Sequence, residues 1–212
     1  MKYYRYLNRI KVFLTFNFIF FSLTAQYQKI DSLKDMIQNV QLNDSLLTSL
    51  YQRISQEYKN VDVDSTYSYL NKAKQTSKYL ENVYLYCHTN VLLGDYFNRN
   101  GLPDSMKYYY NQSLSLANMN GLEDIQASIY NGYGVYHMNL SNYDTALFFM
   151  QQASKISESI NDMDMLNKSY NNIGIIHYHL GNYDKSLYYY NKSLDIRKNL
   201  EYIDSPRQNW FF

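Results

Sequence analysis

Four histidines and one cysteine are the side chains of this 212-residue sequence best suited to bind a metal or attack a substrate. They are Cys87, His88, His137, His177 and His179. A zinc site needs several such side chains converging about 2.0–2.3 Å from the ion. His177 and His179 are two positions apart in a segment with helical spacing, so they point to different sides of a helix. No carboxylate or second cysteine completes a ligand set, and we expect core or surface histidines instead of a metal site.

Cys87 and His88 form the one pair that has the types of a thiol nucleophile and its base. Adjacent residues on a helix diverge by about 100°, and no third group is evident to orient the histidine. The sequence also lacks a glycine-rich phosphate loop and a serine nucleophile elbow. We therefore predict a packed thiol, no catalytic residue, no cofactor and no enzymatic activity. A single cysteine also excludes an intramolecular disulfide.

A 40-residue repeat organises most of the chain. Gly94, Gly134 and Gly174 are 40 residues apart, and a second series of four aspartates keeps the same interval. These aspartates are Asp64, Asp104, Asp144 and Asp184. In the last unit, apolar and aromatic residues recur twice at three- and four-residue steps, which predicts two amphipathic helices per unit. We call them the A helix and the B helix, and the sequence predicts an all-α fold of about four such units.

Polar breaks separate the helices within and between units. Asn142 and Asn182 stand where they can cap B helices, and Pro103 suits the first position of the B helix in the second unit. The breaks are short, so neighbouring helices should run antiparallel. The first unit is irregular: Tyr58 takes the place of Phe97 only if the connection between its two helices is one residue shorter. End units of a repeat array are often atypical.

Residues 1–25 have the pattern of an export signal. Four basic residues precede the apolar stretch Val12–Leu23, and the chain can be cut before Gln26. The stretch is shorter than the roughly 20 residues that cross a bilayer. Leu23 is larger than the residue usual three positions before a cut, so an uncleaved anchor is the alternative interpretation. Either interpretation predicts an exported protein of the periplasm or cell envelope.

The charge balance argues against a nucleic-acid partner. The whole chain has a formal net charge of +1, and loss of residues 1–25 leaves 16 basic against 19 acidic residues, a net charge of −3. Such a chain does not attract phosphate backbones. We expect association with a membrane only through the N-terminal segment or through a partner.

A short helix is predicted ahead of the repeats, within residues 26–43. Ile30, Leu33 and Ile37 fall on one stripe of this helix and can cover the exposed apolar edge of the first unit. We interpret this segment as an N-terminal cap, followed by the repeat array over residues 44–200.

The C-terminal end of the array is open in the sequence pattern. A fifth A helix should follow residue 200, but Ser205-Pro206 disfavours a helix and Trp210-Phe211-Phe212 ends the chain, so residues 201–212 are predicted to be an irregular tail. An exposed apolar edge calls for a cap, a partner or a second copy of the chain, and self-association is one expectation.

The units resemble tetratricopeptide repeats. In the fourth unit the family pattern is carried by Ile173-Gly174, His177, Gly181, Tyr183, Ser186, Tyr190 and Ser193. The resemblance covers about Leu46 to Leu200 and implies an α-solenoid, although the unit has 40 instead of 34 residues and lacks the usual Trp and Pro. The long units, the export signal and the segment "KIDSLKDMI" also resemble the periplasmic input regions of Bacteroidetes-type sensor kinases and regulators.

This resemblance implies a concave surface lined by A helices, where a protein or peptide partner binds. Asn131 and Asn171 are equivalent there, and an asparagine amide both donates and accepts, which suits an extended peptide backbone. The same register adds further groove candidates: Asp95, Arg99, Val135, Asn139, Ile175 and His179. A merely solvated face is the alternative for these positions. We therefore expect a non-enzymatic peptide-binding scaffold; the alternative is the input region of a membrane sensor kinase or transcriptional regulator whose output part lies outside this chain.

Overall fold

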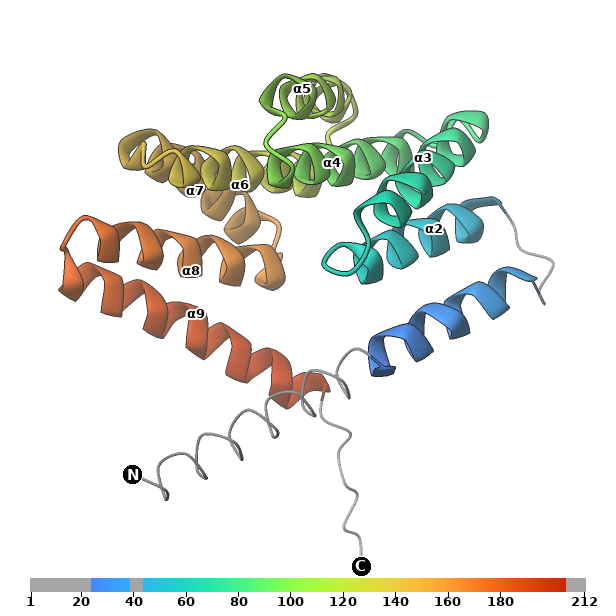
Figure 1. The fold of residues 1–212 in the computed structure, drawn as a ribbon. Coiled ribbons are helices and arrows are strands. Elements are labelled where there is room, and N and C mark those ends of the chain that lie inside the picture. The colour runs from blue at the N-terminus through green and yellow to red at the C-terminus, as the bar shows by residue number, and fades with distance from the viewer. Residues whose placement is uncertain (1–23, 39–43, 205–212) are drawn as a thin grey trace, which may run out of the picture. The chain divides into compact units, whose positions relative to one another are not determined.

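The structure is a computed structural model that describes residues 24–38 and 44–204, and every regular element in these ranges is a helix (Figure 1). The predicted all-α fold of four helical hairpins is therefore confirmed. Residues 1–23 of the predicted export segment and the Ser205-Pro206 and Trp210-Phe211-Phe212 features lie outside the described residues, and the last two residues of that segment begin the first helix. Among the residues described, no helix is long and apolar enough to span a bilayer.

A helix over residues 24–38 precedes four helical hairpins, which we number as repeats 1 to 4. The hairpins are α2 (Asp44–Tyr58) with α3 (Val63–Tyr79), α4 (Val83–Arg99) with α5 (Pro103–Asn120), α6 (Glu123–Asn139) with α7 (Tyr143–Ser159), and α8 (Met163–His179) with α9 (Tyr183–Asp204). The even-numbered helices are the predicted A helices and the odd-numbered ones the B helices.

The chain divides into two compact units, Met1–Thr89 and Asn90–Phe212, with the boundary inside α4. In the first unit α2 packs on α3. In the second unit α5 packs on α6, α6 on α7, α7 on α8 and α8 on α9. The A helices α6 and α8 also contact each other directly. Within the second unit each helix from α5 to α9 therefore packs on the next, and repeats 3 and 4 share one core cluster, as expected of stacked helix pairs.

Turns with the same geometry recur every 20 residues. Each contains one residue with a positive φ between 54° and 74°, the left-handed conformation common after the end of a helix. These residues are Glu81, Gly101, Gly121, Ser141, Asn161 and Gly181. The amide of the following residue closes each turn by donating to a carbonyl five residues earlier, as Asn142 does to His137 at 2.9 Å. A 40-residue unit is thus two equal halves, each a helix and a turn.

The predicted helix starts are correct in part. α5 begins at Pro103, as predicted. Asn142 stands at the N-cap of α7 but its side chain makes no cap hydrogen bond, so that prediction was wrong; Asp144 still places a negative charge in the first turn. Side-chain caps occur instead at other turns, where Asp62 accepts from the Ser65 amide and Asp162 from the Met165 amide.

The helix over residues 24–38 covers α2 within the first unit. Ile30 and Leu33 are buried against Leu50, Ile54 and Tyr58, and the third residue of the predicted stripe, at position 37, is partly buried beside them. The stripe thus covers α2 as expected for a cap.

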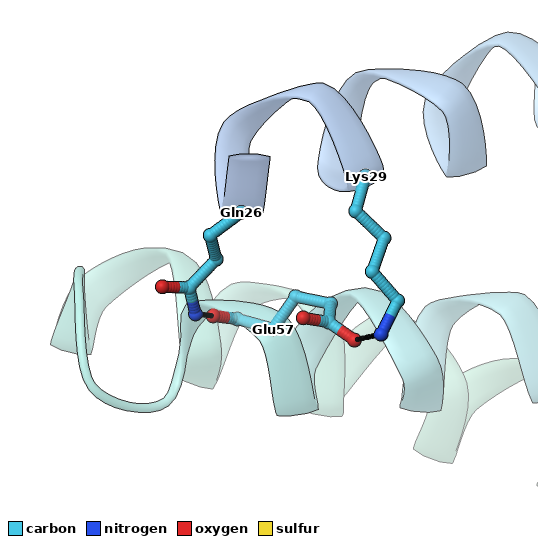
Figure 2. Close-up of polar contacts among 3 residues, drawn as sticks. All are labelled: Gln26, Lys29 and Glu57. Atoms are coloured by element: carbon cyan, nitrogen blue, oxygen red, sulfur yellow. Dashed lines mark hydrogen bonds and ion pairs between the residues drawn. The ribbon is translucent and has the colours of Figure 1, made fainter. Parts of the chain in front are cut away.

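Polar contacts fasten the start of this helix to the C-terminal end of α2. Gln26 Nε2 donates to the Glu57 carbonyl oxygen, and Lys29 Nζ lies 2.5 Å from the Glu57 carboxylate (Figure 2). Lys34 Nζ also donates to the Tyr58 hydroxyl at 2.9 Å. Together with the apolar stripe, these contacts set the position of the helix along α2.

Candidate binding surface

A glycine on each A helix of repeats 2 to 4 admits a large side chain from its own B helix. The pairs are Gly94 with Tyr110, Gly134 with Met150 and Gly174 with Tyr190. A Cβ atom at Gly94 would lie 2.2 Å from Tyr110 Cε1, and one at Gly174 would lie 2.9 Å from Tyr190 Cδ1, closer than carbon atoms can approach. The 40-residue glycine period therefore marks the close approach of each A helix to its B helix.

One turn further along each A helix, a ring stacks on a ring of the B helix. The pairs are Phe97 with Tyr109, His137 with Phe149 and His177 with Tyr189, with centroids 5.3–5.7 Å apart. Tyr58 stacks on Tyr69 at 5.8 Å in the same way. This stack confirms that Tyr58 replaces Phe97 in repeat 1, one residue closer to its partner along the chain.

His137 and His177 are structural members of these stacks. Burial, and secondarily the charges of Lys107 and Lys185, lower the pKa of the two imidazoles. Each has a buried Nδ1 atom without a hydrogen-bond partner. The neutral form is therefore the one that suits the folded state. The prediction of core or surface histidines holds for this pair, since both occupy positions where other repeats have Tyr or Phe.

Cys87 and His88 are not arranged as a nucleophile and its base. Cys87 is completely buried, and His88 Nδ1 lies 3.1 Å from Gln52 Oε1. Within the described part of the chain, no three His, Cys, Asp or Glu residues are grouped so that they could hold a metal ion. The remaining candidate chemistry is that of the A-helix surface, which we define as the eight predicted positions Asp95, Arg99, Asn131, Val135, Asn139, Asn171, Ile175 and His179.

At the start of this surface, Asp95 is held by a buried tyrosine. Tyr110 reaches from α5 past Gly94 and Gly132 and donates its hydroxyl to Asp95 Oδ1 at 2.5 Å. Burial and the neighbouring carboxylate raise the pKa of Tyr110 well above its ordinary value, so the phenol stays protonated as the donor. Arg99 is exposed one turn later, with Nε 3.5 Å from the Asp95 carbonyl oxygen. The structure thus brings Asp95 and Arg99 together.

The two equivalent asparagines differ in their surroundings. Asn131 Oδ1 accepts a hydrogen bond from Asn172 Nδ2 on α8 at 3.1 Å, and Asn131 is half-buried. Asn171 is exposed. The contact between α6 and α8 explains the difference, because the following A helix covers Asn131, whereas no described A helix follows α8. Asn171 therefore has the more accessible amide, and Asn131 also joins two repeats.

The other predicted positions on α6 and α8 form a surface of mixed polarity. Val135 packs on the core of repeats 3 and 4, and Ile175 is half-buried on the next A helix. Asn139 and His179 are exposed, and the His179 ring stacks on Tyr143 with centroids 5.7 Å apart and planes within 6°. Neighbouring helices thus present amide, imidazole and aliphatic groups, which suits a ligand with a polar backbone and apolar side chains.

Sequence reasoning missed three contributors to this surface. Tyr110 lies on a B helix and was not among the predicted site residues, yet its hydroxyl donates to Asp95. Asn172 pairs with Asn131 from the neighbouring repeat, and Tyr143 supports His179. One signal was available: Gly132 breaks the 40-residue pattern, with Leu92 and Asn172 at its equivalent positions. An unmatched glycine in a helix indicates that another side chain approaches closely.

Comparisons with known families match two segments of the chain. The tetratricopeptide repeat model matches residues 168–200, which fall in repeat 4. The SusR N-terminal TPR domain model matches residues 23–102, which include the N-terminal helix and repeat 1. No curated protein sequence matches this chain significantly.

Solved structures similar to this chain share its fold at low sequence identity. BtubC (BKLC) from P. vanneervenii matches with a TM-score of 0.61 and 18% identity over 83% of this chain and 72% of its own. Aspartyl phosphate phosphatase F from Bacillus subtilis matches with a TM-score of 0.64 and 18% identity over 79% of this chain and 44% of its own. The apo form of RapI matches with a TM-score of 0.59 and 15% identity over 84% and 51%. This chain therefore spans about half the length of the last two.

Proposed function

We propose that this chain, a tetratricopeptide-repeat protein, is a non-enzymatic scaffold that binds an extended protein segment along the A-helix surface. The observation that carries this proposal is the exposed amide of Asn171, next to Ile175 and His179 on α8. An amide pairs with a peptide backbone whatever its side chains, whereas the aliphatic and ring groups select among side chains.

Asp95 and Arg99 supply the charged end of the surface. Tyr110 restrains the Asp95 carboxylate, so little conformational freedom is lost when a ligand donor binds it. Arg99 offers donors to a ligand carboxylate or carbonyl. We infer that the bound segment carries a polar or charged residue toward α4 and an apolar residue toward α8.

The test begins with peptides selected from a random linear library by binding to the wild-type chain. Asn171→Ala should weaken the binding of such a peptide by about 5- to 30-fold, since it removes hydrogen bonds worth roughly 1–2 kcal/mol. Gln151→Ala is the matched control, because Gln151 is an exposed amide on the B helix α7. Equal affinities for all three proteins would contradict the proposal. Asn131→Ala is a less specific test of peptide binding than Asn171→Ala, because it also removes the hydrogen bond from Asn172.

A second candidate function is the input region of an envelope sensor kinase or transcriptional regulator. The match of residues 23–102 to the SusR N-terminal TPR domain favours it. The proposal predicts that the coding sequence downstream of this chain continues into an apolar segment of about 20 residues, followed by an output domain. A stop codon followed by unrelated sequence would argue against it.

Export to the periplasm or cell envelope is part of both proposals and rests on the pattern of residues 1–25. Expression of the whole chain with an N-terminal-sequence readout tests it. A mature chain that begins at Gln26 supports a cleaved signal, and an intact N-terminus in the membrane fraction supports the anchor. An intact chain in the cytosol would contradict export.

A further inference from the structure

The C-terminal edge of the array exposes an apolar surface that the preceding repeat keeps covered. Three pairs of equivalent residues show this: Met138 and Tyr178, Tyr143 and Tyr183, and Leu147 and Leu187. The repeat 3 members are half-buried. The repeat 4 members, which we call the terminal patch, are 57%, 65% and 61% exposed in the same order.

The helix that covers this surface of repeat 3 is the A helix α8. Met138, Tyr143 and Leu147 pack against a core cluster to which α8 contributes Leu166, Tyr170, Ile173 and Ile176. At the end of α8 the His179 ring stacks on Tyr143. The interface between α7 and α8 therefore defines what fits this kind of surface: an amphipathic helix with an apolar stripe and a ring in its last turn.

The terminal patch has an aromatic pair, and a hollow lies beside it. The rings of Tyr178 and Tyr183 contact each other, with centroids 5.7 Å apart. A hollow of about 380 Å³ lies beside Tyr183, lined by residues 181–185. Tyr183 is equivalent to Tyr143, on which the His179 ring stacks in repeat 3. The charged rim of Asp184 and Lys185 is exposed.

We propose that the terminal patch docks an amphipathic helix of a partner protein, which packs on α9 as α8 packs on α7. The proposal goes beyond the function proposed above, because it uses the edge of the array and not the A-helix surface. A second copy of the chain is a poorer occupant. In a second copy, α6 and α8 already pack on the preceding B helices α5 and α7, and α2 lies under the helix over residues 24–38.

The test uses a probe whose fit is known from the structure: a fluorescent peptide with the sequence of α8, Met163–His179. The full-length chain should bind this peptide saturably, as measured by fluorescence anisotropy. The Leu187→Asp variant should weaken binding by about tenfold or more. The matched control is Met119→Asp, which changes a 79% exposed residue of α5 and should bind like the wild type. A peptide carrying Ile173→Asp and Ile176→Asp should not bind. Helical circular dichroism verifies that each variant is folded.

Several results would overturn the proposal. The first is the absence of saturable peptide binding to the wild type, and the second is an equal loss of peptide binding in both protein variants. The third is a dimer in sedimentation that Leu187→Asp abolishes, which would assign the patch to a second copy. Asn171→Ala should leave binding of the α8 peptide unchanged, which separates this proposal from the A-helix surface. If Asn171→Ala weakens this peptide as much as Leu187→Asp does, the peptide does not dock at the edge and the proposal fails.

Discussion

The two ends of the repeat array differ in what covers their outermost helix. At the N-terminal end, the helix over residues 24–38 lies on α2, and its Ile30 and Leu33 are 0% and 4% exposed. At the C-terminal end, Tyr183 and Leu187 of α9 are 65% and 61% exposed. Both outermost helices have an apolar stripe made for a neighbour, and within the described residues only the first has one.

This difference follows from the stacking of the repeats, because each repeat packs on the repeats next to it. Each hairpin buries one apolar face internally and presents another to the next hairpin, so every array has two faces left over. In this chain the helix over residues 24–38 covers the first of these two faces. Burial of a side chain such as Ile30 contributes about 1.5–3 kcal/mol, and exposed Leu187 gains nothing comparable until something covers it.

The largest expected effect comes from truncating the cover at the N-terminal end. Ile30→Ala should reduce the free energy of unfolding by about 2–5 kcal/mol, because it leaves a cavity between the cap helix and α2. Leu187→Ala should change it by less than about 0.5 kcal/mol, as at ordinary surface positions. Urea denaturation followed by circular dichroism measures both. Similar losses in the two variants would mean that the ends are equivalent in solution.

Acid should destabilise repeats 3 and 4 before repeat 1. The A-helix ring that stacks on the B helix is His137 in repeat 3 and His177 in repeat 4, whereas it is Tyr58 in repeat 1. The pKa of each imidazole is lowered by folding, so the unfolded chain takes up protons near pH 6.5 and the folded chain only at lower pH. Stability is therefore complete above about pH 6.5 and falls as the pH drops below it.

Hydrogen exchange at about pH 8 and about pH 5 tests this pH dependence. Protection should fall in α6 to α9 and persist in α2 and α3. Replacement of both histidines by Phe, the residue at position 97, should remove most of the difference. If the double variant loses protection on acidification as the wild type does, the imidazoles are not the cause.

A smaller, stabilising effect is expected at the turns. Ser141 has φ 57°, a conformation that disfavours residues other than glycine, whereas Gly101 and Gly181 occupy equivalent turns. Ser141→Gly should raise the free energy of unfolding by roughly 0.5–1 kcal/mol, after the greater freedom of glycine in the unfolded chain is deducted. Chemical denaturation measures this, with Ser154→Gly inside α7 as the destabilising control. A loss at both sites would contradict the shared turn geometry.

The smallest effect concerns the polar contacts of the N-terminal cap. Glu57→Gln keeps the backbone carbonyl that Gln26 contacts but removes the ion pair with Lys29, which is 58% exposed. We expect a loss of only about 0.2–1 kcal/mol, and the loss should vanish in high salt. A loss as large as that of Ile30→Ala would show that charge and not apolar burial holds the cap.

Much of this fold could be predicted from the sequence, because the 40-residue recurrence of glycine reflects a physical contact. Tyr110 or Tyr190 fits against the A helix only where no Cβ intervenes. The 20-residue recurrence of turns was not visible, because Glu81, Ser141 and Asn161 adopt the same left-handed conformation as the glycines. Asparagine adopts this conformation readily, but glutamate and serine do not, so residue type alone does not reveal the turns at Glu81 and Ser141.

The candidate site was less predictable, because its details depend on contacts between repeats. Asn131 and Asn171 are equivalent by register, but only the first meets Asn172 of a following repeat. The sequence position of Tyr110 gave no sign that its hydroxyl holds Asp95, since that requires Gly132 to leave space from a third helix. Register predicts which residues face the same side, and packing decides which of them are accessible.

The most direct test of the central claim, that the A-helix surface binds an extended protein segment, is to observe the asparagine side-chain amides by nitrogen-15 NMR. A peptide selected on the wild-type chain is added, and the resonances are assigned by their loss in Asn171→Ala and Gln151→Ala. We expect a large shift of the Asn171 side-chain amide and no shift of the Gln151 amide. A shift of Gln151 with Asn171 unmoved would contradict it, because the ligand would then lie on the B helices.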